Sequence, residues 1–204
     1  MNTFQIKPNS YLSESIDGFY HTDYLGYNKP GNPMYLNRLK NDCHHQSETE
    51  LITDANKVLE IIMTELPKVM QKKSLHRPVV CLMPRAKAPS SYTPDQLLFS
   101  KAVSDAVDSI KGLKNGTTWI TRIKPTQTTH LRNSYNYYDD GISPYQGITK
   151  DTCFISPKVQ GRNIILVDDI YTADVNIIED SVQALLEQGA KTIISYVVAK
   201  TKKH

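Results

Sequence analysis

The chain lacks the long apolar runs, the cysteine framework and the low-complexity tracts that would place it in a specialised class of protein. No apolar stretch approaches the roughly 20 residues that a helix needs to span a bilayer. The first five residues, MNTFQ, do not show the charged-then-apolar pattern of a secretion signal. The cysteines, Cys43, Cys81 and Cys153, are few, odd in number and widely spaced. They are typical of free thiols in a reducing compartment, which predicts a cytoplasmic protein without membrane contact.

Strong charge and disorder are also absent. A net charge of +3 over 204 residues does not by itself indicate a nucleic-acid-binding protein. An apolar content of 39% with 22% charged residues is typical of a globular chain. This length provides enough volume for a hydrophobic core in one domain of ordinary size.

Residues 1–45 differ in composition from the rest of the chain. They contain many tyrosines, among them Tyr11, Tyr20 and Tyr24, together with glycines and prolines, and they show little periodicity. This composition predicts irregular structure with room for a short strand or hairpin. We therefore divide the chain into a tyrosine-rich N-terminal arm, residues 1–45, and an α/β domain, residues 46–204.

Three segments carry helix signals. A long amphipathic helix begins with a capping box of Ser47 and Glu50. A second helix begins with another capping box at Thr93. A third occupies residues 175–188 and ends at Gly189, where a left-handed cap is expected.

Strand-forming runs alternate with these helices. From residue 77 onward, this alternation predicts an α/β fold with a mainly parallel, Rossmann-like sheet covered by helices. The predicted strands are residues 77–83, 117–123, 152–155, 163–167 and 192–198.

The run IILVDDIYT, residues 164–172, carries the strongest chemical signal. Its four apolar residues end in Asp168 and Asp169. A buried parallel strand would deliver these acids to the carboxyl edge of the sheet, where open α/β folds bind their ligands. Carboxylates accept hydrogen bonds from hydroxyl groups, so the pair suits the hydroxyl groups of a sugar. The alternative is that the acids only cap a strand or face solvent.

A helix start follows the two acids and predicts a phosphate site. Backbone N–H groups at a helix N-terminus attract anions, and Thr172 adds a hydroxyl group. Such a site beside the acid pair suits a sugar phosphate. The predicted phosphate-binding segment comprises Tyr171, Thr172, Ala173, Asp174, Val175 and Asn176.

Asp174 opposes phosphate binding in this segment. At about 5 Å and an effective dielectric near 20, its carboxylate would repel one unit of phosphate charge by roughly 3 kcal/mol. Asp is also a good N-cap for the helix that follows. In that role its carboxylate would occupy the place of a substrate phosphate.

The sequence from Ile164 to Thr172 resembles the signature of the type I phosphoribosyltransferases. That signature is an apolar strand, two acids, two apolar residues, Thr and then a small Thr- and Gly-rich phosphate loop. The chain departs from it at Asp174, where the family normally has Gly, and at Asn176, where it normally has Thr. The resemblance spans roughly residues 77–200 and is nearest to the competence-type (ComF-like) and orphan amidophosphoribosyltransferase-like members.

Two basic segments add to the resemblance. Arg85 and Lys87 follow the first predicted core strand, where family members place their pyrophosphate loop, and a guanidinium and an ammonium both suit a diphosphate. An exposed basic turn is the alternative. Arg122 and Lys124 open a stretch similar to the start of the family's flexible loop, which closes over the reacting centre. Tyrosines within residues 135–138 of that loop could stack on a base or form an interface.

The resemblance implies a phosphoribosyltransferase with an atypical phosphate loop. It implies that phosphoribosyl pyrophosphate binds with magnesium and that ribose 5-phosphate is transferred to a nitrogen nucleophile with release of pyrophosphate. Asp168 and Asp169 would hold the ribose, with magnesium entering near them through the substrate, and Arg85 would steady the leaving group. Residues 1–45 are then a candidate for the family's variable hood, and a homodimer is expected.

The departure at Asp174 motivates a second hypothesis. The chain would be a nucleotide-binding sensor or partner protein that keeps the fold with an altered pocket. Its output would be binding to another protein, such as a DNA-handling protein, or to nucleic acid.

Overall fold

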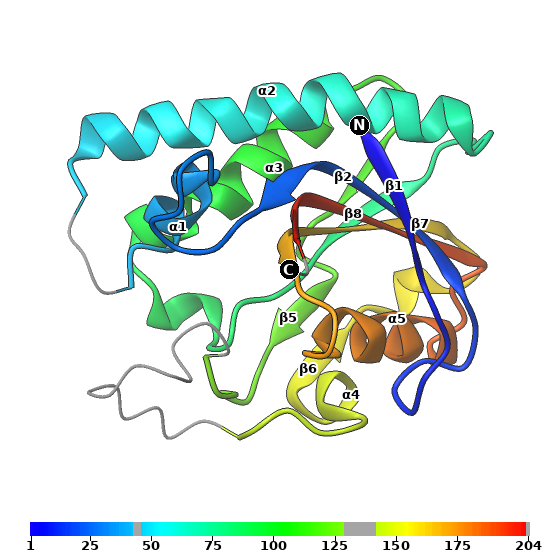
Figure 1. Cartoon of the computed structure of the whole chain (residues 1–204). Helices are drawn as coiled ribbons and strands as arrows, with labels where there is room; N and C mark the ends of the chain where they lie inside the picture. Colours follow the sequence, from blue (N-terminus) through cyan, green and yellow to red (C-terminus); the bar gives the residue numbers. More distant parts are fainter. Residues whose placement is uncertain (43–45, 129–141, 203–204) are drawn as a thin grey trace.

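The structure, a computed structural model, describes residues 1–42, 46–128 and 142–202 and contains a six-stranded central sheet and a second, two-stranded sheet (Figure 1). The strands are β1 (Asn2–Ile6), β2 (Ile16–Tyr24), β3 (Val79–Leu82), β4 (Lys114–Gly116), β5 (Ile120–Arg122), β6 (Cys153–Ile155), β7 (Asn163–Tyr171) and β8 (Thr192–Thr201). The α-helices are α1 (Met34–Lys40), α2 (Glu48–Lys72), α3 (Leu98–Ser109), α4 (Ile148–Thr152) and α5 (Ile177–Glu187), and short 3-10 helices are η1 (Pro89–Ser91), η2 (Pro94–Leu97) and η4 (Pro157–Val159).

The central sheet has the strand order β1-β2-β8-β7-β3-β4 and is mainly parallel, as the sequence predicts. β2, β8, β7, β3 and β4 pair in parallel, and the edge strand β1 pairs with β2 in antiparallel fashion. β5 and β6 form the antiparallel second sheet. The α/β fold class and the parallel helix-covered sheet are therefore confirmed.

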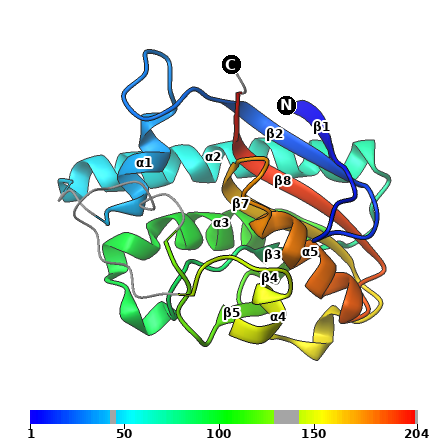
Figure 2. The ribbon, with the colours of Figure 1, turned by 60° about the horizontal axis from the view of Figure 1, so that its bottom comes forward.

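Helices cover both faces of the central sheet (Figures 1 and 2). Because side chains alternate along a strand, Ile165 and Val167 of β7 point to one face, where they pack with α1, α2 and α3. Ile164 and Leu166 point to the other face, where they pack with α5 and with the β5–β6 sheet. β7, the strand that carries the two acids, therefore has an apolar layer on each side.

Two strands within the first 24 residues, β1 and β2, belong to the central sheet. β1 and β2 form a hairpin, and Gly18–Tyr24 of β2 pairs along Ser195–Thr201 of β8. The predicted hairpin is confirmed, but the expectation of mainly irregular structure is wrong for these residues. A Cβ at Gly18 would lie 2.4 Å from the Phe4 ring, so glycine permits the close approach of this ring to β2.

The predicted strand at residues 117–123 is shortened to β5, Ile120–Arg122, and β4, which precedes it at Lys114–Gly116, was not predicted. β4 joins the central sheet although its sequence, Lys-Asn-Gly, has no strand-favouring side chain. Its backbone decides the pairing, because the Lys114 N–H donates to the Pro78 carbonyl at 3.0 Å. β5 lies instead beside β6, so the predicted strand at 152–155 also belongs to the second sheet.

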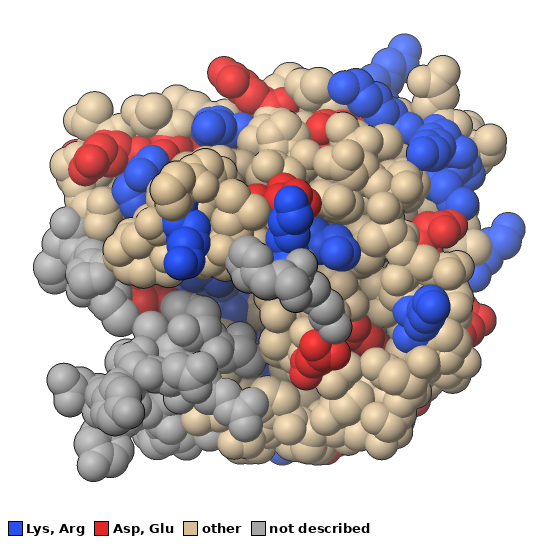
Figure 3. All heavy atoms as spheres, in the orientation of Figure 1, with Lys and Arg blue, Asp and Glu red and all other residues tan. Residues whose placement is uncertain are grey.

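The helix signals are confirmed. The Ser47 hydroxyl accepts from the Glu50 N–H, and the Ser47 N–H donates to the Glu50 carboxylate, so α2 begins with the predicted capping box. The box at Thr93 caps η2, which leads directly into α3. Among the described residues, no helix combines the length and apolarity needed to cross a membrane. The face in Figure 3 carries basic and acidic side chains together, so charge of one sign does not cover it.

Candidate functional site

The candidate site lies where the chain topology changes direction between the adjacent parallel strands β3 and β7. From β3 the chain continues through α3 to the outer strand β4, on the sheet face that α2 also covers. From β7 it continues through α5, on the opposite face, to β8. In open α/β sheets such a switch point leaves a crevice outside the carboxyl ends of the two strands, and ligands bind there.

A cavity of about 600 Å³ occupies this crevice. A volume of several hundred cubic ångströms is typical of small-molecule sites. The cavity is lined by α1, by the segment after β3, by the end of β7 and by the start of α5. Of the predicted site residues it contacts Arg85, Arg122, Asp168, Asp169, Tyr171, Thr172 and Val175.

Asp168 and Asp169 lie where β7 extends beyond β3. The last β3 pair is Leu82 with Val167, and the Met83 N–H donates to the Val167 carbonyl at 2.9 Å. On its other side β7 stays paired with β8 as far as Tyr171. The strand was predicted to end at Val167, but its pairing with β8 prolongs it. The acids therefore project from a strand that is supported on one side and open to the cavity on the other.

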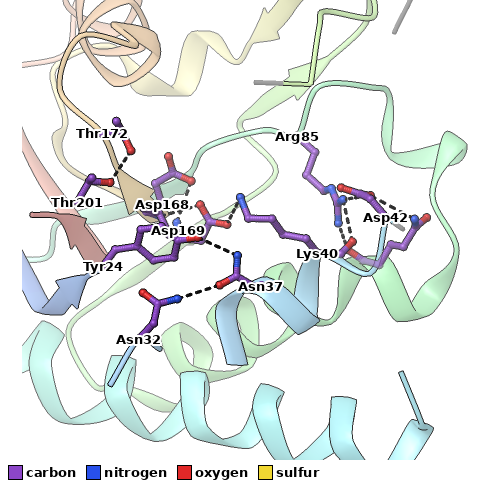
Figure 4. A network of polar contacts seen from close by, with 12 residues as sticks. Tyr24, Asn32, Asn37, Lys40, Asp42, Arg85, Asp168, Asp169, Thr172 and Thr201 are labelled. Atoms are coloured by element: carbon purple, nitrogen blue, oxygen red, sulfur yellow. Dashed lines mark hydrogen bonds and ion pairs between the residues drawn. The ribbon is translucent and has the colours of Figure 1, made fainter. Parts of the chain in front are cut away.

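The two acids are not equivalent. Asp169 forms an ion pair with Lys40 of α1, with 2.9 Å between Oδ2 and Nζ (Figure 4). Each carboxylate also accepts a backbone N–H from the next residue: Asp168 Oδ1 from Asp169 at 2.8 Å, and Asp169 Oδ1 from Ile170 at 2.6 Å. Burial, and then the charge of Asp169, raise the pKa of Asp168 well above its ordinary value of 3.8.

Lys40 remains a cation in this environment. Burial by itself lowers the pKa of its ammonium group, but the charges of Asp169 and Asp168 outweigh this effect and raise the pKa above its ordinary value. Lys40 and Asp169 retain 22% and 21% of their side-chain exposure, so solvent reaches both groups. The ion pair therefore lies on the cavity wall.

Arg85 lies on the other side of Lys40 from the acids (Figure 4). Its guanidinium donates to Asp42 Oδ1 at 2.5 Å, to the Gln96 carbonyl at 2.5 Å and to the Lys40 carbonyl at 3.0 Å. It also lies 4.3 Å from the centre of the Tyr92 ring. Arg85 thus contacts the cavity, but protein groups engage much of its hydrogen-bonding capacity.

Arg122 also contacts the cavity and is only 5% exposed. Its Nε donates to the Arg85 carbonyl at 3.2 Å, and its Nη1 donates to the Thr152 hydroxyl. No described carboxylate lies within ion-pair distance of it, and burial lowers its pKa below the ordinary value of 12.5. A buried cation whose described hydrogen-bond partners are neutral oxygens favours an anionic ligand.

Lys87 and Lys124 do not contact the described cavity. Lys87 is only partly exposed, and its backbone N–H donates to the Tyr92 hydroxyl at 3.0 Å. Lys124 is exposed, and its backbone N–H donates to the Thr152 carbonyl at 3.1 Å. The prediction for tyrosines 135–138 falls outside the described residues.

The predicted phosphate segment forms a turn with two left-handed residues. Asp174 has φ +76° and Asn176 has φ +62°. Asn176, and not Asp174, occupies the N-cap position of α5, and it makes no capping hydrogen bond through its side chain. The interpretation of Asp174 as an N-cap is therefore wrong. Its side chain is exposed and does not contact the described cavity, so it does not fill this cavity in place of a phosphate.

Other contacts tie this turn to the core. The hydroxyls of Thr172 and Thr201 lie 2.6 Å apart, which links the turn to the end of β8. The buried Tyr171 hydroxyl donates to Glu179 at 2.7 Å, and burial, followed by this bond, raises the Tyr171 pKa. Ala173 packs at the margin of the apolar layer under α5.

The sequence gives no signal for the contribution of α1. Lys40, Asn37 and Tyr24 contact the cavity from the segment that was predicted to be mainly irregular. The Asn37 amide donates to the Tyr24 hydroxyl at 3.0 Å, which joins α1 to the end of β2. A seven-residue helix without a side-chain cap has no strong local pattern, so only the folded chain reveals that Lys40 meets Asp169.

Two comparisons with known proteins complete the description of the site. A scan of protein-family models gives no match to this chain, and a search of curated proteins gives none either.

Among the described residues, no group of three or more His, Cys, Asp and Glu side chains is placed to hold a metal ion.

Proposed function

We propose that this chain binds phosphoribosyl pyrophosphate in the switch-point cavity and transfers ribose 5-phosphate to a nitrogen nucleophile with release of pyrophosphate. One observation carries the proposal. Asp168 and Asp169 project from β7 into a cavity of about 600 Å³ that also contacts Arg85 and the buried Arg122. Acceptors for a diol and donors for a phosphate thus share one cavity.

The acids would act on the ribose. Their oxygens can accept hydrogen bonds from the 2- and 3-hydroxyls. Their negative charge would also favour the positive character that develops on the sugar as the bond from C1 to the pyrophosphate oxygen breaks. The nitrogen then forms the new bond to C1 and loses a proton to solvent, while the pyrophosphate leaves with the electron pair.

The two arginines would hold the diphosphate. Arg122 offers a buried cation without a described carboxylate partner, and Arg85 offers a guanidinium beside it. Because the Arg122 Nε binds the Arg85 carbonyl, the two residues form one wall of the cavity. Lys87 and Lys124 are not part of this proposal, since neither contacts the described cavity.

Magnesium, which the family resemblance implies, does not fit as an ion held directly by the acid pair. Asp169 Oδ2 already binds the Lys40 ammonium, and the positive charge of Lys40 would repel a magnesium ion at that oxygen. Any magnesium would therefore enter on the diphosphate oxygens of the substrate. No step proposed for this chain depends on it.

The test is pyrophosphate release by purified protein given phosphoribosyl pyrophosphate, magnesium and a panel of nucleobases and ammonia. We expect release to depend on both acids, so that Asp168→Asn with Asp169→Asn abolishes it. Asp108→Asn, a change to an exposed acid on α3, is the control and keeps the activity. Release no greater than that of the double variant across the panel would refute the proposal.

A second function, a nucleotide-binding sensor or partner protein, is favoured by a different observation. Lys40 already pairs with Asp169 and Asp42 already pairs with Arg85, so protein groups engage a large part of the polar site. Calorimetry with phosphoribosyl pyrophosphate separates the two functions. Binding of phosphoribosyl pyrophosphate by the parent chain without release of pyrophosphate would favour the sensor. A cytoplasmic location, a homodimer and a protein partner stay predictions.

A further inference from the structure

The contact between Lys40 and Asp169 has a second consequence for the site. The ammonium of Lys40 lies 2.9 Å from Asp169 Oδ2 (Figure 4). It interacts with the charges of both acids, and Arg85 is the cation whose charge opposes it. The Lys40 ammonium therefore places a positive charge directly beside the acid pair.

The backbone of α1 and the residues after it hold this lysine in place. Leu36 and Leu39 of α1 are buried in the core layer shared with α2, so the helix cannot easily shift. The Lys40 carbonyl accepts from Arg85, and the Asn41 carbonyl accepts from the Gln96 side chain at 3.2 Å. Lys40 is therefore tied to the cavity through its backbone as well as through its ammonium group.

The oxygens of the acid pair are largely engaged by the protein itself. Asp169 Oδ2 binds Lys40, Asp169 Oδ1 binds the Ile170 N–H, and Asp168 Oδ1 binds the Asp169 N–H. A divalent cation such as magnesium needs six oxygens at about 2.0–2.1 Å in near-octahedral geometry. Such an ion at the pair would compete with the backbone donors and would be repelled by the ammonium.

We infer that Lys40 supplies at the Asp168–Asp169 pair the positive charge that a directly coordinated divalent cation would otherwise supply, so that the pair binds a sugar diol without metal coordination. The claim that the pair binds a sugar diol rests on the proposed function. The claim that Lys40 excludes a metal ion from the pair does not, because it follows from the ion pair between Lys40 and Asp169 alone. Lys40 is thus a positioning residue, which orients Asp169 and excludes metal from it.

Manganese(II) titration followed by electron paramagnetic resonance tests whether Lys40 excludes a metal ion from the acid pair. Manganese(II) binds oxygen ligands and is itself paramagnetic, so its binding is observed directly. The wild-type chain should show no manganese site that depends on Asp169. Lys40→Met should gain a manganese site, with a Kd at least about tenfold lower than that of any manganese binding seen in the wild type. Lys40→Arg should resemble the wild type, and adding Asp169→Asn to Lys40→Met should remove the gained site. Purely structural damage would not produce this pattern.

Calorimetry with ribose 5-phosphate tests whether the acid pair binds a sugar diol without a metal ion, since this probe carries no diphosphate that could bind magnesium. For the wild type we expect the Kd of ribose 5-phosphate to be the same in magnesium and in EDTA. We expect binding by Lys40→Met to weaken in EDTA and to recover with magnesium. Lys40→Gln replaces Lys40→Met in both experiments if the latter does not show a cooperative thermal unfolding transition.

Two results would overturn the inference. The first is a wild-type manganese site that Asp169→Asn abolishes, or no gain of manganese binding in either uncharged Lys40 variant. The second is ribose 5-phosphate binding by the wild type that EDTA abolishes. If ribose 5-phosphate binds to no variant under either condition, the proposed function fails, and the manganese titration still decides the role of Lys40.

Discussion

The Tyr196 hydroxyl of β8 donates to Glu65 Oε2 of α2 at 2.7 Å, which joins the central sheet to its longest helix. His21 Nδ1 of β2 lies 2.9 Å from the other oxygen of the same carboxylate. Glu65 is 4% exposed, so these contacts satisfy a carboxylate inside the protein. Burial alone would raise the pKa of Glu65, but the bonds from His21 and Tyr196 outweigh it and lower the pKa to about 2.

Glu65→Gln should therefore reduce stability at neutral pH. A folded pKa below the ordinary 4.5 means that the contribution is complete above pH 4.5 and is lost as the pH falls through about 2. We expect a loss of about 1–3 kcal/mol in the free energy of unfolding at pH 7, which shrinks toward pH 2. Urea denaturation at several pH values measures it. Glu60→Gln, exposed on the same helix, is the control; a pH-independent difference contradicts the prediction.

Asp168→Asn should stabilise the chain at neutral pH. The raised pKa of Asp168 means that the folded state holds the proton more tightly than the unfolded state. Stability is therefore unaffected below the ordinary pKa of 3.8 and falls as the pH rises through the folded pKa. The free energy of unfolding of the variant should exceed that of the parent by about 1 kcal/mol at pH 8, and this difference should vanish below pH 3.8.

Thermal unfolding at pH 8 and at pH 3 measures this gain. Asp108→Asn, on the exposed side of α3, should show no comparable effect. A variant that is less stable than the parent at pH 8 would show that Asp168 is not destabilised in the folded state.

Arg122→Met should weaken the binding of a diphosphate. Arg122 is buried on the cavity wall and no described carboxylate pairs with it, so a bound anion would gain a charge-assisted bond there. We expect at least about a tenfold rise in the Kd of inorganic pyrophosphate. Calorimetry measures it, with Lys124→Met as a matched control because Lys124 is exposed and outside the cavity. Equal effects of the two changes would exclude Arg122 from the anion site.

Asp174→Gly should be more stable than Asp174→Ala. The left-handed φ of +76° suits glycine and strains a residue with a Cβ, and alanine lacks the short polar side chain that eases this strain in Asp. We expect a difference of about 1 kcal/mol in the free energy of unfolding. Chemical denaturation of the two variants measures it. Equal stabilities would show that the turn adopts another conformation.

Local sequence patterns were sufficient to predict the helices and strands that are defined by a capping box or by a run of apolar residues. The capping box at Ser47 and the apolar run before Asp168 depend on residues close in sequence, and both were predicted correctly. The pairing of strands was harder to predict from the sequence. β4 is held by backbone bonds to β3, and β2 by its pairing with β8, so neither needs a distinctive side-chain pattern.

The candidate site shows the same division. Asp168, Asp169 and Arg85 were predicted because they directly follow strands, and all three contact the cavity. Lys87 was predicted because it belongs to the same basic segment after the first core strand, but it does not contact the described cavity. Lys40 was missed, because it lies more than a hundred residues from its partner Asp169 in a short helix without a cap.

The amino-acid order by itself determined the α/β alternation, the ends of the main helices and the acidic end of β7, because periodicity and capping act over a few residues. Only the folded chain decided which cations face those acids. Charges interact through space, so Lys40 reaches Asp169 and Arg122 enters the cavity only after the sheet order and the packing of α1 bring distant segments together.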